Sequence, residues 1–167
     1  MGNLKHRDGG TRGPATTSSN VLDCIFDLHT AAICSFLAIE SLANHAIETL
    51  DDATTVTIKK RVYTKHELVR ELRINDKMKR IFPLVDGGRS IAGDAVLWGR
   101  YCALKDLRDE LVHVKKRGIN SDPDDPSAYD RLMLGEGDTC VETACDVVEG
   151  AWPGFLPPHV REALGRG

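Results

Sequence analysis

The fold is indicated first by residues 21–50, which read VLDCIFDLHTAAICSFLAIESLANHAIETL. Apolar side chains recur in this stretch at spacings of three and four residues, the period of a helix with one buried face. We expect a helix over about 21–52, with Asn20 as its N-cap. A second long helix is expected over about 91–116, where Gly118 would stop it. Strand-like alternation is absent nearly everywhere, so the sequence predicts an all-α domain built on two long antiparallel helices.

Shorter elements connect and follow these two helices. Residues 53–63 break the helical pattern with β-branched side chains, and we expect a loop or a short extended piece there. Thr64 and Glu67 have the spacing of a capping box, and Asn75 or Asp76 can cap a further helix. Short helices are therefore expected at about 65–73, 75–82 and 139–151, and from 157 onward.

Length and composition favour a single soluble domain. The chain has 167 residues, 41% of them hydrophobic, and a formal net charge of −3. Residues 1–19 are rich in Gly, Thr and Ser and are expected to form a mobile tail, while 20–167 form one domain. No stretch approaches the roughly 20 apolar residues that span a bilayer, and no secretory signal is recognisable, so we expect a cytoplasmic protein. Five scattered cysteines without zinc spacing are expected to be buried free thiols.

Charge is unevenly distributed along the chain. Residues 59–117 contain 16 Lys or Arg and 8 Asp or Glu, although the whole chain is acidic. This segment could meet a polyanion, or its charges could simply lie on solvated helix faces. Aromatic residues make up only 5% of the chain, which disfavours a base-stacking sheet of the RRM or OB type.

One acidic residue interrupts the apolar stripe of the first long helix. Phe36, Ala43 and Ile47 follow the helical spacing, but Glu40 occupies a position of the same stripe. A carboxylate there is costly unless it is paired or hydrogen-bonded. Asn44 lies one turn further on, so the two side chains can form a polar pair. Glu40 is either a structural ion-pair partner or a site carboxylate.

The second long helix has a matching interruption. Arg108 takes the place in the stripe that the pattern would give to leucine. If the two helices pack face to face, Arg108 meets Glu40, and one contact explains both anomalies. His113 lies five residues on, about 140° around the helix axis from Arg108, so the two do not share a face. His113 is either a cation at the helix C-terminus or a catalytic group that converges on Arg108 in a cleft or a two-fold interface.

The segment LKDLRDELVH (residues 104–113) resembles the signature of HEPN domains, in which an Arg is followed four to six residues later by a His. In that family a polar residue commonly follows the Arg, and Asp109 fits this pattern. The stretch FLAIESLANHAI (residues 36–47) also resembles the first long helix of HEPN-like proteins. The resemblance covers about residues 20–117, and the helical C-terminal part more loosely.

The resemblance implies an up-and-down bundle of four to five helices that forms a homodimer. It also implies a metal-independent endoribonuclease without a cofactor, often a toxin or defence effector, whose products are a 2′,3′-cyclic phosphate and a 5′-OH. By analogy His113 would be the general acid or base, Arg108 would bind the phosphate, Asp109 would orient the site and Glu40 would hold Arg108. Asn44 and the three consecutive basic residues after His113 would bind the RNA; these are Lys115, Lys116 and Arg117.

Two other interpretations of the sequence remain open. A non-catalytic HEPN-like dimer could bind RNA, nucleotide or protein and use Arg108 and His113 only structurally. The chain could also be the toxin of a pair whose neighbouring gene encodes a neutralising antitoxin protein. No group of residues has the spacing of a metal site, and no metal is expected.

Overall fold

A computed structural model of the chain describes residues 18–113 and 126–165. These residues are mostly helical, which confirms the all-α class. Residues 1–17 of the expected N-terminal tail lie outside this part of the chain. The last two residues of that tail, Ser18 and Ser19, begin the first helix. The elements in chain order are α1 (Ser18–Glu48), β1 (Thr55–Ile58), β2 (Arg61–Thr64), α2 (Lys65–Glu71), α3 (Ile74–Asp76), η1 (Lys77–Ile81), η2 (Phe82–Leu84), η3 (Ile91–Gly93), α4 (Ala95–Val112), α5 (Ala128–Arg131), η4 (Leu132–Glu136), α6 (Cys140–Ala151) and α7 (Pro158–Ala163).

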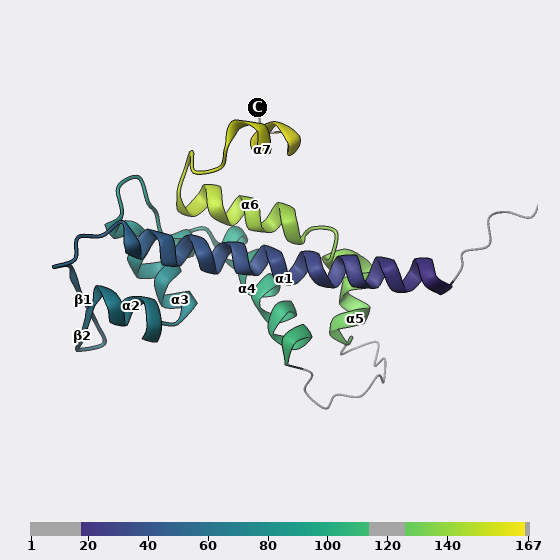
Figure 1. Cartoon of the computed structure of the whole chain (residues 1–167), viewed down its shortest axis with the longest axis horizontal. Coiled ribbons are helices and arrows are strands. Elements are labelled where there is room, and N and C mark those ends of the chain that lie inside the picture. The colour runs from purple at the N-terminus through teal and green to yellow at the C-terminus, as the bar shows by residue number, and fades with distance from the viewer. Residues whose placement is uncertain (1–17, 114–125, 166–167) are drawn as a thin grey trace, which may run out of the picture.

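α1 is the longest helix (Figure 1), and the elements that pack against it are α2, η1, α4, η4 and α6. It starts before the expected position and ends earlier, so Asn20 lies inside the helix and is not its N-cap. Its C-terminal end is held by Lys65, whose Nζ donates to the carbonyl oxygens of Glu48 at 2.9 Å and Leu50 at 2.8 Å. An ammonium at this end satisfies carbonyls that have no partner within the helix.

A β-hairpin and a short helix follow α1. β1 and β2 pair antiparallel, from Thr55 opposite Thr64 to Ile58 opposite Arg61, so the extended alternative for 53–63 is confirmed. The capping box that starts α2 is also confirmed. The Thr64 hydroxyl accepts from the Glu67 backbone N–H at 3.4 Å, and the Glu67 carboxylate accepts from the Thr64 N–H at 2.8 Å.

The helix expected at 75–82 is present as a continuous helical run over 74–84 whose type changes along its length. α3 is followed directly by the π-helical turn η1 and the 3₁₀ turn η2. The prediction that Asn75 or Asp76 caps a helix is wrong, because α3 begins at Ile74 without a side-chain cap. Asn75 Oδ1 instead accepts from the Tyr101 hydroxyl at 2.7 Å, and Asp76 pairs with Arg80.

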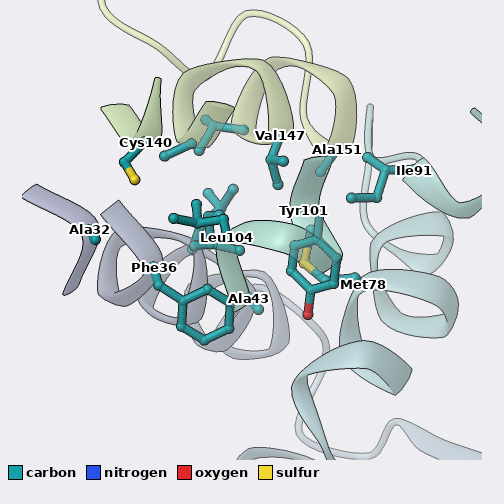
Figure 2. Close-up of a cluster of buried hydrophobic side chains, with 14 of the residues drawn as sticks. Ala32, Phe36, Ala43, Met78, Ile91, Tyr101, Leu104, Cys140, Val147 and Ala151 are labelled. Atoms are coloured by element: carbon teal, nitrogen blue, oxygen red, sulfur yellow. The ribbon is translucent and has the colours of Figure 1, made fainter. Parts of the chain in front are cut away.

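α4 packs against both α1 and α6, which also pack on each other, and side chains from all three helices form the core (Figure 2). Asp94 accepts from two backbone N–H groups and starts the helix at Ala95, so the expected start at 91 is wrong; residues 91–93 form η3. Tyr101 and Leu104 are buried between Phe36 of α1 and Val147 of α6. Each such side chain contributes about 1.5–3 kcal/mol to stability when fully buried. α4 ends at Val112 with His113 as its C-cap, so the expected end near Lys116 is wrong by about one turn; Gly118, which was expected to stop the helix, lies outside the described residues.

The two long helices pack together as predicted, and α4 crosses α1 obliquely rather than running alongside its full length (Figure 1). The helix expected at 139–151 is present as α6, and the helix expected after Pro157 is α7. The described residues also contain α5 and η4, which the sequence did not indicate.

The cysteines are less buried than expected. All five are free thiols, but Cys24 and Cys34 are exposed, so the expectation of burial is wrong for these two. Among the five, only Cys140 is fully buried. Cys34 lies at the middle of α1 next to the buried Ser35 and Phe36, so its exposure follows from the face of the helix that it occupies.

One helix in the described part of the chain, over Val21–Glu48, is long and apolar enough to cross a membrane, contrary to the expectation from the sequence. Core helices of soluble proteins meet the same criteria of length and composition. This helix supplies Phe36, Ile39 and Ala43 to the buried core. Only 22% of the apolar window of this helix is buried, so the core accounts for part of its apolar composition and not for all of it.

Candidate functional site

The ion pair expected between the two long helices is present. Arg108 Nη2 on α4 lies 3.3 Å from Glu40 Oε2 on α1. The two side chains are 21% and 31% exposed, so the pair lies at the edge of the core and not in its centre. Both residues interrupt apolar stripes, and their contact allows each helix to keep packing around them. The prediction that one contact explains both anomalies is confirmed.

Three groups hold the Arg108 guanidinium. Besides Glu40, Asp109 Oδ1 accepts from Nη1 at 2.9 Å, and the guanidinium carbon lies 5.1 Å from the centre of the Phe36 ring. Arginine has five N–H donors, and these two carboxylates occupy only one on each Nη atom. The Nε atom is buried and has no hydrogen-bond partner among the described residues. The side chain is thus fixed in place while donors remain to bind an anion.

Asp109 links Arg108 to a second cation. Lys105 Nζ donates to Asp109 Oδ2 at 2.6 Å, one helical turn earlier on α4. Burial acts to raise the pKa of Asp109, but the hydrogen bonds from Lys105 and Arg108 outweigh it and lower the pKa below its usual value. Asp109 is therefore ionised at neutral pH and orients the guanidinium, which agrees with the orienting role expected for it.

Asn44 lies near Glu40 but has a different partner from the one expected. No hydrogen bond joins the Glu40 and Asn44 side chains in the described part of the chain. Asn44 Oδ1 instead accepts from Lys77 Nζ at 2.7 Å, and the same ammonium donates to the Val69 carbonyl oxygen at 2.8 Å. The expectation that Asn44 pairs with Glu40 is wrong, because η1 brings a lysine within reach. In this arrangement Asn44 satisfies a buried cation.

Lys77 was not identified from the sequence. It is only 6% exposed, and burial lowers the pKa of its amine, while the nearby Glu40 carboxylate acts in the opposite direction. A signal was present in the sequence, because Ile74 and Ile81 lie three residues before and four after Lys77. Lys77 thus interrupts an apolar stripe in the same way as Glu40 and Arg108.

His113 lies at the C-terminal end of α4. It is exposed and forms the C-cap, where its backbone N–H donates to the Asp109 carbonyl oxygen at 3.0 Å. Within the described residues no hydrogen bond or ion pair joins its imidazole to Arg108. In a single chain, therefore, Arg108 and His113 lie near the same end of α4, but their side chains are not linked to each other. The expected RNA-binding residues Lys115, Lys116 and Arg117 lie outside the described residues.

A cavity of about 340 Å³ lies elsewhere, on the face of α4 that packs against α6. Its lining includes Arg100, Cys140 and Thr143 and none of Arg108, Glu40 or Asp109. Arg100 is engaged by the Asp146 carboxylate and by the Thr143 hydroxyl at 3.1 Å. The described residues contain no group of three or more His, Cys, Asp or Glu side chains placed to hold a metal ion. The candidate site is therefore a partly exposed surface around Arg108 and not this cavity.

No family model, curated protein or solved structure matches this chain. The resemblance to HEPN domains stays a prediction that depends on the motifs quoted above.

Proposed function

We propose that this protein is a metal-independent endoribonuclease of the HEPN type. It would cleave RNA by attack of a ribose 2′-OH on the adjacent phosphate, giving a 2′,3′-cyclic phosphate and a 5′-OH. The observation that carries the proposal is the state of Arg108. This guanidinium is held at the edge of the core by Glu40, Asp109 and Phe36, and the two carboxylates leave an N–H donor unoccupied on each Nη atom.

The chemistry assigned to each residue follows from its position. The unoccupied N–H groups on the two Nη atoms of Arg108 would donate to the phosphate oxygens, where negative charge increases in the transition state. His113, exposed next to the end of the same helix, would take the 2′-OH proton or protonate the leaving 5′-oxygen. An imidazole suits both steps because its ordinary pKa is near neutrality. The reaction is internal, so atoms balance without a cofactor.

A homodimer is part of this proposal, because His113 and Arg108 of one chain do not meet. α1 carries exposed apolar side chains, among them Leu22 at 66%, Phe26 at 68% and Leu37 at 45%. Leu37 lies one turn before Glu40. A second copy packed on this face would cover these side chains and enclose the Arg108 site. We further propose a cytoplasmic toxin or defence effector, with an antitoxin protein encoded by a neighbouring gene as its partner.

The second candidate is a non-catalytic helical scaffold that binds RNA, nucleotide or protein. It is favoured by the two carboxylates on Arg108, since an arginine already neutralised by Glu40 and Asp109 has the surroundings of a structural ion pair. In this case Arg108 serves only to allow α1 and α4 to pack. Removal of His113 would then have no effect on any activity.

A cleavage assay with matched histidine variants separates the two candidates. Purified protein is incubated with end-labelled single-stranded RNA and tRNA in EDTA, and the product ends are identified. The variants are His113→Ala and His159→Ala, because His159 is also an exposed histidine but lies on α7. Both variants are checked for unchanged folding by circular dichroism.

The endoribonuclease predicts cyclic phosphate ends in EDTA, produced by the wild type and by His159→Ala and lost in His113→Ala. Equal cleavage by all three proteins would show a contaminating nuclease or a different site. RNA left intact by a folded dimer would favour the scaffold.

A further inference from the structure

The turn of the β-hairpin has an unusual composition. Lys59 and Lys60 form the two-residue connection between the paired residues Ile58 and Arg61. Both lysines have positive φ angles, 50° and 70°. This is the conformation of a type I′ turn, for which Asn-Gly is strongly preferred because other side chains are strained in the left-handed region. The chain therefore keeps two lysines at positions where folding alone favours other residues.

The hairpin holds this strained turn through its packing. Ile58, next to the turn, is 3% exposed and packs in a cluster with Ile47 and Leu68. Val56 and Tyr63 pack against the same cluster from the two strands. Strained backbone persists only where surrounding structure fixes it, and such positions are often functional.

The two turn lysines differ from the neighbouring cations in having no acidic partner. Both are exposed, and the ion pairs found in the described part of the chain include neither of them. Arg61, by contrast, pairs with the carboxylate of Glu71. Lys65 pairs with Asp52 at 3.0 Å. The cations at the turn are therefore available to an external anion.

The positive charge continues beyond the turn. Arg70 in the last turn of α2 and Arg73 just after that helix are both exposed, and Glu71 between them pairs with Arg61. The acidic residues Asp51 and Asp52 precede the open end of the hairpin. The length of β1 separates that end from the turn by about 10 Å. A row of cations on two successive elements suits a polyanion better than a single small anion.

We propose that the hairpin turn is an RNA-binding element in which Lys59 and Lys60 contact phosphates of single-stranded RNA. This inference rests on the proposed function, because it names the surface that holds the substrate away from Arg108. The hairpin lies where α1 ends, beside α2 (Figure 1). Glu40, which pairs with Arg108 of α4, lies about two turns before that end of α1. The turn would therefore contribute to binding of long RNA and not to the chemical step.

Binding is measured separately from cleavage with a fluorescent RNA of about 16 nucleotides. Its 2′-O-methyl groups remove the nucleophile, so the proposed reaction cannot occur. The test variant is Lys59→Asn/Lys60→Gly, which relaxes the turn and removes both charges. The control is Lys59→Arg/Lys60→Arg, which keeps the charges and the side-chain constraint on the turn. Anisotropy is recorded over a range of salt concentrations, and thermal unfolding is recorded for every protein.

The Asn-Gly variant should unfold at a temperature higher by about 2–4 °C because its turn is relaxed. It should nevertheless bind RNA more weakly, with the slope of log affinity against log salt reduced by about 1.4, the value for two lost phosphate contacts on a single strand. The Arg-Arg variant should bind like the wild type. A more stable protein that binds less RNA cannot be explained by damage to the fold.

Three results would overturn the inference. Unchanged RNA binding by the Asn-Gly variant would exclude the turn from the RNA surface, while His113-dependent cleavage would still support the proposed function. Wild-type binding to anionic phospholipid vesicles, with no binding to RNA, would assign the lysines to a membrane surface instead. If the wild type neither binds nor cleaves any RNA, the proposed function fails with the inference.

Discussion

The contact between Arg108 and Glu40 can be tested by a double-mutant cycle on stability. The variants are Glu40→Gln, Arg108→Met and the double substitution; methionine keeps the aliphatic packing on Phe36. At 3.3 Å and an effective dielectric constant of about 20, the Coulomb attraction is roughly 5 kcal/mol. Partial exposure of both side chains and the competing Asp109 carboxylate reduce this value. We expect a coupling energy of about 1–3 kcal/mol, between the values for exposed and buried pairs.

Urea denaturation followed by far-UV circular dichroism gives the four unfolding free energies of the cycle. The chain offers a matched control in Arg61 and Glu71, an arginine–glutamate pair whose side chains are 52% and 45% exposed. Arg61→Met, Glu71→Gln and their combination should give a coupling below about 1 kcal/mol. High salt should weaken the control pair more than the Arg108 pair, because screening acts mainly on exposed charges.

The reasoning is refuted if the Arg108–Glu40 coupling is no larger than that of the control pair. In that case the two stripe interruptions would be tolerated independently, and Glu40 would have no role in holding Arg108. A larger coupling, with Arg108→Met more destabilising alone than in the Glu40→Gln background, would confirm an ion pair that each residue needs.

Three further changes test the fold around the site. Burial lowers the pKa of Lys77 below the unfolded value near 10.5, so between those two pKa values the unfolded chain binds more protons and the free energy of unfolding rises with pH. Lys77→Met should flatten that rise, which urea titrations across the alkaline range would measure. The same substitution removes the ammonium that donates to Asn44. Gly88→Ala should destabilise by about 1–3 kcal/mol in thermal unfolding, because the added methyl collides with the backbone carbonyl oxygen of Phe82; a stability equal to wild type would show that the turn can open freely. Thr64→Ala removes the N-cap of α2 and should cost about 0.5–2 kcal/mol, and no loss in urea denaturation would mean that tertiary packing alone holds this helix.

The parts of the fold that local sequence determines were predicted well. α1 follows from the repeat of apolar residues, and α2 follows from the Thr64–Glu67 capping box. The hairpin was not recognised, because its turn is Lys59-Lys60 and carries none of the Asn or Gly residues by which such turns are identified. The packing of Ile58 on a second cluster fixes this turn, and that packing involves residues distant in sequence.

The site was predicted where two interruptions on long helices could be matched, and it was missed at Lys77, which lies in the short helix expected at 75–82. Glu40 and Arg108 each occupy a long regular helix, so their faces could be assigned and their contact inferred. Lys77 lies in a π-helical turn, whose register differs from that of an α-helix, and its partners Asn44 and Val69 come from separate elements. Sequence spacing marks Lys77 as an interruption between Ile74 and Ile81, but it does not identify these partners.

The position of Lys77 also decides which variant tests the function of Arg108 cleanly. The Glu40 carboxylate contacts Arg108 and also favours the charged form of Lys77, so a Glu40 variant disturbs two cations at once. Arg108→Lys keeps the positive charge and leaves Lys77 with both of its hydrogen-bond partners, but it removes the forked donors that bind two oxygens of a phosphate. If the endoribonuclease is real, this variant should retain most of the stability of the wild type and lose most of the cleavage. Equal losses of both would assign Arg108 to the packing of α1 and α4 alone.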